Sequence, residues 1–152
     1  MFSSFVYSSP IGEIGLLKDK DTLISVSLTD PLFKDLASKK EHKNFKEIIR
    51  QLDEYFFEGR KIFNIEYSLS ATNFGTKVYK EMYKIPYGNT ISYSELAKKV
   101  RNPRAYRAVG NLCGKNLLPI IIPCHRVIAK SSIGGFTGGL GIKKFLLKLE
   151  RN

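Results

Sequence analysis

Residues 92–113 read SYSELAKKVRNPRAYRAVGNLC and indicate two short helices joined by a tight turn. Ser92 and Glu95 have the spacing of a capping box, which predicts that a helix starts at Ser92. Pro103 suits the first turn of a second helix, expected over about residues 104–113, because its missing N–H needs no partner there. The pair predicts a helix-turn-helix, with a helix pair that only packs a core as the alternative.

The second helix of this pair is basic and slim. It carries two arginines, and its small residues would let its backbone approach phosphates closely. The residues of this helix that we expect to contact DNA are Arg104, Ala105, Arg107, Ala108 and Gly110.

Positive charge is concentrated in the second half of the chain. The net charge of +11 divides into 10 Lys/Arg against 11 Asp/Glu in residues 1–72 and 15 against 3 in residues 73–152. Such a concentration of cations attracts polyanions, with an affinity that falls as the salt concentration rises. The charge therefore favours nucleic acid as a partner, and a solvated, solubilising surface is the alternative.

The first third of the sequence predicts antiparallel strands covered by one helix, an α/β unit. The apolar strand segments lie at residues 5–7, 14–17 and 23–28. Apolar residues then recur at helical spacing from Phe45 to Phe56, and Gly59 is expected to end that helix. Phe63, Ile65 and Tyr67 alternate with polar residues, which predicts a further strand.

Residues 68–73 are polar and small, and they fall where the charge balance changes, so we interpret them as a linker. The expected domains are then residues 1–67 and 74–152. The second domain begins with a predicted helix, which ends where the chain turns at Pro86. Further along, the β-branched run at residues 120–122 predicts a short buried strand.

The composition indicates a globular, intracellular (cytoplasmic) protein. The 152 residues are 43% hydrophobic, without the roughly 20 consecutive apolar residues that span a bilayer. Two cysteines are too few for a disulfide framework. The Cys and His residues, at positions 42, 113, 124 and 125, are too scattered for zinc, and the glycines of residues 134–139 lack phosphate-loop spacing. We therefore expect neither a metal nor a cofactor.

Cys124, His125 and Arg126 follow the predicted buried strand. A thiol must be ionised to attack carbon, and a nearby base or cation can lower its pKa. His125 is the nearest base in sequence, and Glu150 on the terminal helix is the candidate acceptor that would fix the tautomer of the imidazole. We expect a solvent-reachable sulfur facing a pocket. The alternative is a buried, inert cysteine, which is the role we assign to Cys113.

The chain resembles a known family over residues 79–150. The most specific motif is IPCHRV at residues 122–127, with RAVG at residues 107–110 and GGL at residues 138–140. These motifs are similar to those of the O6-alkylguanine-DNA alkyltransferases. The resemblance implies that residues 1–67 form a ribonuclease-H-like domain of sheet and helix, and that residues 74–152 form a winged helix-turn-helix domain.

The resemblance also implies roles for single residues. Cys124 would accept the alkyl group, and His125 would take its proton through a water molecule. Glu150 would orient His125, and Asn116 would brace the loop beside them.

Further implied roles concern DNA and the damaged base. Arg107 would fill the space left by a flipped base, while Tyr93 would push on the phosphate. Arg126 is also expected to bind DNA. The residues expected to line the guanine pocket are Val127, Phe136, Thr137 and Gly138. The family commonly has tyrosine where this chain has Phe136. The resemblance therefore implies that Phe136 stacks on the base but makes no hydrogen bond through a hydroxyl.

The implied activity is DNA repair by direct reversal. Cys124 would take the alkyl group from O6-alkylguanine, with O4-alkylthymine as a further candidate, once per protein molecule. The target base must leave the duplex stack, and minor-groove entry of a slim helix implies binding without sequence preference by a monomer. The alternatives are an alkylguanine-binding protein without transfer, a cysteine hydrolase, and a transcription factor that would leave Cys124 without a role.

Overall fold

The computed structural model describes residues 2–28, 44–136 and 138–151. The chain forms two compact units, residues 1–69 and residues 70–152. The fold is mixed α/β, as predicted, with a three-stranded antiparallel sheet in the first unit and mainly helices in the second. No helix among the described residues is both long enough and apolar enough to cross a membrane.

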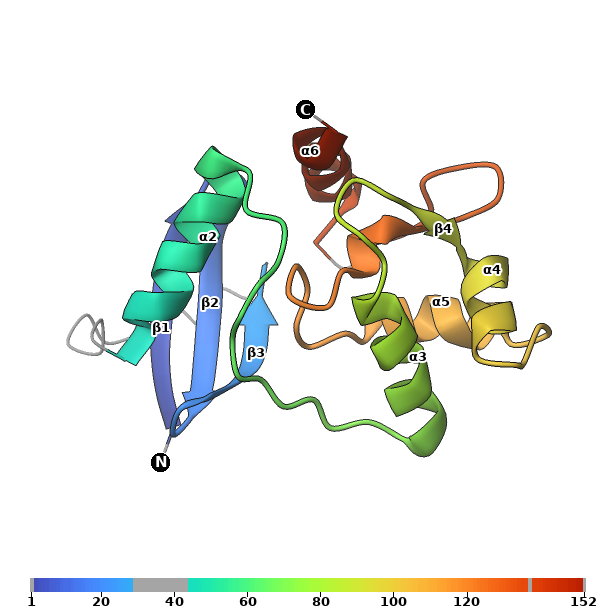
Figure 1. The fold of residues 1–152 in the computed structure, drawn as a ribbon, viewed down its shortest axis with the longest axis horizontal. Helices are drawn as coiled ribbons and strands as arrows, with labels where there is room; N and C mark the ends of the chain where they lie inside the picture. Colours follow the sequence, from blue (N-terminus) through green and yellow to red (C-terminus); the bar gives the residue numbers. More distant parts are fainter. Residues whose placement is uncertain (1, 29–43, 137, 152) are drawn as a thin grey trace. The chain divides into compact units, whose positions relative to one another are not determined.

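The sheet of the first unit has the strand order β1-β2-β3 (Figure 1). Its strands are β1 (Phe2–Ser9), β2 (Gly12–Asp19) and β3 (Thr22–Ser27). Tyr7 pairs with Ile14 across β1 and β2, and both side chains are buried because they point to the same face. Gly12 makes the tight turn between these strands with a φ of 104°, which a side chain would oppose.

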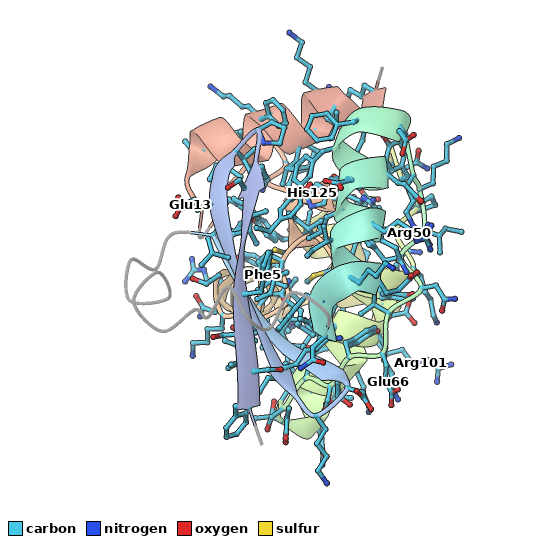
Figure 2. The ribbon with its side chains drawn as sticks, turned by 90° about the vertical axis from the view of Figure 1, so that its left-hand side faces the viewer. Phe5, Glu13, Arg50, Glu66, Arg101 and His125 are labelled. Carbon is cyan, nitrogen blue, oxygen red and sulfur yellow. The ribbon has the colours of Figure 1, made fainter. Side chains whose placement is uncertain are left out.

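Helix α2 (Lys46–Glu58) covers one face of this sheet (Figure 1). Tyr55 and Phe56 are buried from its apolar stripe, and the Tyr7 hydroxyl donates to Asp53 Oδ1 at 2.6 Å. Arg50 extends from the opposite face of the helix into solvent (Figure 2). Gly59, in the left-handed conformation, ends the helix as predicted.

The strand predicted at residues 63–67 is wrong. In the described part of the chain this segment forms an isolated bridge to the sheet, where the Leu23 amide donates to Glu66 O and the Ser68 amide donates to Leu23 O, both at 3.0 Å. The side-chain amide of Gln51 instead pairs with both backbone groups of Asn64, at 2.8 and 2.9 Å. A side chain on α2 thus takes the hydrogen bonds that a neighbouring strand would need.

The second unit contains the predicted helix-turn-helix (Figure 1). Its first helices are α3 (Asn73–Tyr83), α4 (Tyr93–Lys99) and α5 (Tyr106–Gly114). Ser92 caps α4 as expected, since its hydroxyl accepts from the Glu95 amide at 3.0 Å. Helix α5 starts two residues later than predicted because Ala105 N–H donates to Asn102 O and closes a turn around Pro103.

A small parallel sheet and a terminal helix complete this unit. Strand β4 (Ile91–Ser92) pairs with β5 (Val127–Ile128), and α6 (Leu140–Arg151) follows the glycine-rich segment. The sheet joins the start of α4 to the segment after Cys124. It therefore links the helix-turn-helix to the thiol.

The strand predicted at residues 120–122 is also wrong, although all three residues are buried. Ile120 has a φ of 75°, and the Ile122 amide donates back to Leu118 O at 2.8 Å. Positive φ is costly for a β-branched residue, so the surrounding contacts must hold this turn. The Asn116 side chain supplies two of them, by donating to Ile122 O at 2.8 Å and accepting from the Leu118 amide at 3.0 Å.

Candidate active site

Cys124 opens a single turn of 3-10 helix, η2 (Cys124–Arg126). The turn forms because Pro123 cannot donate a hydrogen bond, while its carbonyl accepts from the Arg126 amide at 3.0 Å. The Cys124 amide donates to Ile122 O at 2.8 Å. The thiol is thereby fixed between a tightly folded turn and strand β5.

The Cys124 thiol is more buried than expected. The residue is 2% exposed, so the expectation of a solvent-reachable sulfur is wrong for this structure. Burial raises the pKa of the thiol to about 11, while the Asn116 side chain, Lys143 and nearby backbone amides act in the opposite direction. The resting thiol is therefore protonated, and its reaction with an electrophile requires a base and an opening to the substrate.

His125 and Glu150, which the sequence analysis expected to act as base and orienter, lie in hydrogen-bond contact. His125 Nε2 lies 2.7 Å from Glu150 Oε2, and both side chains are buried. Burial lowers the pKa of His125 and outweighs the opposite effect of Glu150. Burial would raise the pKa of Glu150, but its hydrogen bonds with His125 and Arg126 lower it well below its ordinary value. A neutral imidazole thus faces a carboxylate.

The second nitrogen of this imidazole has a free lone pair. Because Glu150 accepts at Nε2, the neutral ring carries its proton there, and Nδ1 is left as an acceptor. Nδ1 is buried and has no hydrogen-bond partner within the described part of the chain. A buried acceptor without a partner is unfavourable, so this atom is suited to receive a proton directly or through a water molecule.

Arg126 does not have the position expected of a DNA-binding residue. Its side chain is buried, with Nε donating to Glu150 Oε1 at 2.8 Å and Nη2 donating to Oε2 at 3.1 Å. Nη1 donates to Ile85 O at 2.7 Å. The expectation is corrected: this guanidinium holds the Glu150 carboxylate in place and is already occupied.

The other residues expected to contact DNA are not buried, unlike Arg126. Arg104, Arg107 and Ala108 are exposed on and before α5, while Ala105 and Gly110 are half-buried. Among residues 92–115 the sole acidic residue is Glu95. The exposed cations of this segment are Lys98, Lys99, Arg101, Arg104, Arg107 and Lys115. The helix-turn-helix therefore presents a basic surface.

The residues expected to line the guanine pocket belong to β5 and to the loop that follows it. Val127 is fully buried in β5, and Phe136 and Gly138 are half-buried. Thr137 lies outside the described residues. Tyr93 on α4 lies against this loop, since a Cβ on Gly134 would lie 2.6 Å from its hydroxyl. Within residues 2–28, 44–136 and 138–151, no three His, Cys, Asp or Glu side chains gather as a metal site.

Lys143 is a site residue that the sequence analysis missed. Its side chain is fully buried, and Nζ donates to Val127 O at 2.7 Å and to Gly135 O at 3.0 Å. The signal was its spacing, because Lys143, Leu147 and Glu150 fall on one face of α6. A lysine on a helical face that also carries apolar residues and a buried carboxylate is a candidate buried cation.

Two family models match the chain. The model of the 6-O-methylguanine DNA methyltransferase DNA-binding domain matches residues 73–152, and that of the ribonuclease-like domain of the same protein matches residues 5–69. The methylated-DNA–protein-cysteine methyltransferase of Methanosarcina acetivorans is 40% identical over 149 residues, which cover 95% of this chain and 96% of that protein. The constitutive enzyme of Bacillus subtilis is 39% identical over 151 residues, covering 94% and 92%.

Solved structures agree with these matches. A crystal structure of the Mycobacterium tuberculosis O6-methylguanine methyltransferase superposes with a TM-score of 0.85 at 33% identity, covering 99% of this chain and 93% of that one. The same organism's protein in complex with DNA gives a TM-score of 0.84 at 36% identity, covering 98% and 92%. With both domains matched in order, the chain belongs to the 6-O-methylguanine DNA methyltransferase family.

Proposed function

We propose that this protein repairs O6-alkylguanine in DNA by transferring the alkyl group to Cys124. The observation that carries the proposal is the buried His125 imidazole, which Glu150 holds by Nε2 while Nδ1 has no partner in the described residues. This arrangement supplies a neutral base next in sequence to a thiol whose pKa is raised by burial. Family membership supports the same activity.

The reaction is a displacement at saturated carbon. As His125 takes the thiol proton through a bridging water, the sulfur of Cys124 attacks the alkyl carbon and a C–S bond forms. The C–O6 bond breaks, and its electron pair goes to the guanine, which takes up the proton that left the thiol and becomes the normal base. Glu150 stabilises the positive charge that develops on the imidazole, and the hydrogen bonds from Arg126 hold that carboxylate in place. The thioether has no low-energy route back, so each molecule reacts once.

The damaged base reaches the thiol only outside the duplex. Extrusion costs a few kcal/mol and is least costly for a mismatched or damaged base. In our proposal Arg107 fills the gap, Tyr93 turns the nucleotide at its phosphate, and Phe136 stacks on the base with Thr137 and Gly138 beside it. Since Cys124 is 2% exposed, the residues that cover it must move to admit the guanine.

DNA binding is proposed through the exposed basic helix-turn-helix. The M. tuberculosis relative was crystallised with DNA, which supports DNA as the partner. Small residues on α5 suit approach to the minor groove, and phosphate contacts would give most of the affinity without sequence preference. We propose a monomer that acts in the cytoplasm, where both free cysteines would stay reduced. O4-alkylthymine is a second candidate substrate.

The test is incubation with duplex DNA that contains one O6-methylguanine, followed by peptide mass spectrometry. We expect a gain of one methylene mass on the Cys124 peptide and loss of the lesion. Cys124→Ser should bind the duplex without transfer, and Cys113→Ser is the matched control that should retain transfer. Tight binding with an unmodified Cys124 would contradict the proposal and support a sensor that binds without transfer.

A further inference from the structure

The turn that follows α3 contacts the carboxylate of Glu150. The chain reverses at residues 86–89 through a backbone hydrogen bond of 3.0 Å. The Gly88 amide in this turn donates to Glu150 Oε1 at 3.3 Å, across 62 residues of sequence. A backbone donor from outside α6 thus binds the group that holds the imidazole of His125.

This close approach depends on glycine at position 88. Gly88 has a φ of 82°, in the left-handed region, which a side chain opposes. A Cβ there would lie 3.0 Å from Glu150 O, so either the turn or the end of α6 would have to shift. The lack of a side chain therefore lets the turn pack directly on the residue whose carboxylate it binds.

The same turn contacts Arg126, the other partner of Glu150. Ile85 O accepts from Arg126 Nη1 at 2.7 Å, and the guanidinium carbon lies 5.7 Å from the centre of the Tyr87 ring. An aromatic face attracts a guanidinium most strongly where water is excluded, and Arg126 is buried. The turn thus holds both members of the buried ion pair.

The two oxygens of the carboxylate have different partners. Oε1 accepts from the Gly88 amide at 3.3 Å and from Arg126 Nε at 2.8 Å. Oε2 accepts from Arg126 Nη2 at 3.1 Å and lies 2.7 Å from His125 Nε2. Rotation of the carboxylate would break the bonds at Oε1, so the donors there keep Oε2 on the imidazole. Because that contact fixes the tautomer, the turn acts on the base through Glu150.

We propose that Gly88 and Tyr87 are positioning residues for alkyl transfer. Together they hold the Glu150–Arg126 pair so that Oε2 keeps the imidazole of His125 in its reactive tautomer. This inference rests on the proposed function for its effect on transfer. Its effect on the tautomer can be measured in the protein without DNA.

The first experiment compares Gly88→Ala with Gly59→Ala. Both positions have a left-handed backbone, with φ of 82° and 74°, but a Cβ at Gly59 meets nothing within 4 Å. Heteronuclear NMR of the histidine ring nitrogens gives the tautomer, and the signals of His125 are those missing in His125→Gln. We expect a protonated Nε2 and an unprotonated Nδ1 in the wild type and in Gly59→Ala, and a mixture of tautomers in Gly88→Ala.

Single-turnover transfer from duplex DNA follows the same comparison. Gly88→Ala should slow transfer about tenfold, because a small displacement of a catalytic group is costly in rate. Gly59→Ala should keep the wild-type rate, since its backbone strain lies in the first unit. A wild-type tautomer or a wild-type rate in folded Gly88→Ala would overturn the proposal, as would an equal loss in Gly59→Ala.

The second experiment is a series at Tyr87. Tyr87→Phe keeps the ring beside Arg126 and loses only the long contact of the hydroxyl with Leu149 O, at 3.5 Å, so transfer should stay within about twofold of wild type. Tyr87→Leu removes the ring and should slow transfer about fivefold, with mixed tautomers. Tyr83→Leu, at an exposed tyrosine of α3, is the control. Equal rates for Tyr87→Phe and Tyr87→Leu would overturn the proposal, and this series decides if Gly88→Ala does not fold.

Failure of the proposed function gives a different result. In that case the wild-type protein would acquire no methyl group from duplex DNA. The tautomer of His125 would still respond to Gly88→Ala, because the NMR measurement requires no damaged base.

Discussion

The imidazole of His125 and the carboxylate of Glu150 meet at 2.7 Å although both side chains are buried. Arg126 donates two further hydrogen bonds to the same carboxylate, at 2.8 and 3.1 Å. Glu150 therefore has two tasks: it neutralises a buried guanidinium and it fixes the tautomer of a buried base. Each task predicts a different consequence of changing the residues involved.

Glu150→Gln should destabilise the second unit by about 3–5 kcal/mol, because it leaves the buried Arg126 charge without its partner. Transfer should be lost as well, since the amide no longer fixes the imidazole as a base. Glu81→Gln removes the exposed pair with Lys84 and should change stability by less than about 1 kcal/mol. Urea unfolding monitored by circular dichroism compares the two variants. Equal stabilities would show that the buried pair contributes no more than the exposed one.

Stability should fall as the pH is lowered. The pKa of His125 is lowered from 6.5 in the folded state, so below pH 6.5 the unfolded chain binds the proton first and folding is disfavoured. The pKa of Glu150 is lowered from 4.5, which adds a further loss below that pH. At neutral pH neither group imposes this loss.

Thermal melting between pH 7.5 and pH 5 checks this prediction. The wild-type melting temperature should drop over this range, and His125→Gln should show a smaller drop because the titrating group is gone. A pH-independent wild-type melting temperature would mean that His125 titrates alike in both states.

Arg107→Ala should slow repair of duplex DNA by about tenfold while leaving reaction with free O6-methylguanine unchanged, because only the duplex needs a flipped base to be replaced. The salt dependence of DNA binding should also weaken by about one counterion. Lys77→Ala, an exposed residue of α3, is the matched control. Single-turnover rates on both substrates decide the point, and equal losses on both would remove the flipping role.

Gly134→Ala should impair transfer more than Gly141→Ala. Gly134 has a φ of 75°, and a Cβ there would lie 2.6 Å from the Tyr93 hydroxyl and 3.1 Å from the Ala129 amide nitrogen. The new methyl group would push Tyr93 and the loop apart, besides straining the backbone. Gly141 on α6 has nothing within 4 Å of its Cβ position. Transfer rates and melting temperatures of both variants test this prediction. Equal values for the two variants would contradict a close contact between Gly134 and Tyr93.

Local signals in the sequence predicted the local structure well. The cap at Ser92 and the stop at Gly59 depend on neighbouring residues alone, and both are confirmed. The two segments wrongly predicted to be strands, residues 63–67 and 120–122, take their conformation from hydrogen bonds with distant residues or with side chains. Gln51 and Asn116 take the backbone groups there, which no periodicity of apolar residues can reveal.

The site could be predicted in part. A thiol, an imidazole and a carboxylate could be named from their chemistry, and the structure brings His125 and Glu150 together. Arginine side chains are usually exposed, whereas the two oxygens of Glu150 make the burial of Arg126 possible. Lys143 was missed for the same reason. Burial of charged side chains depends on tertiary partners that a sequence does not place side by side.

The stoichiometry of repair tests the central claim most directly. Protein is mixed with a tenfold excess of duplex DNA that contains O6-methylguanine, and the number of lesions removed per protein molecule is followed to completion. We predict a plateau at one lesion per protein, with the methyl group recovered as S-methylcysteine at position 124. Continued removal beyond one equivalent, or a plateau with Cys124 unmodified, would contradict the account.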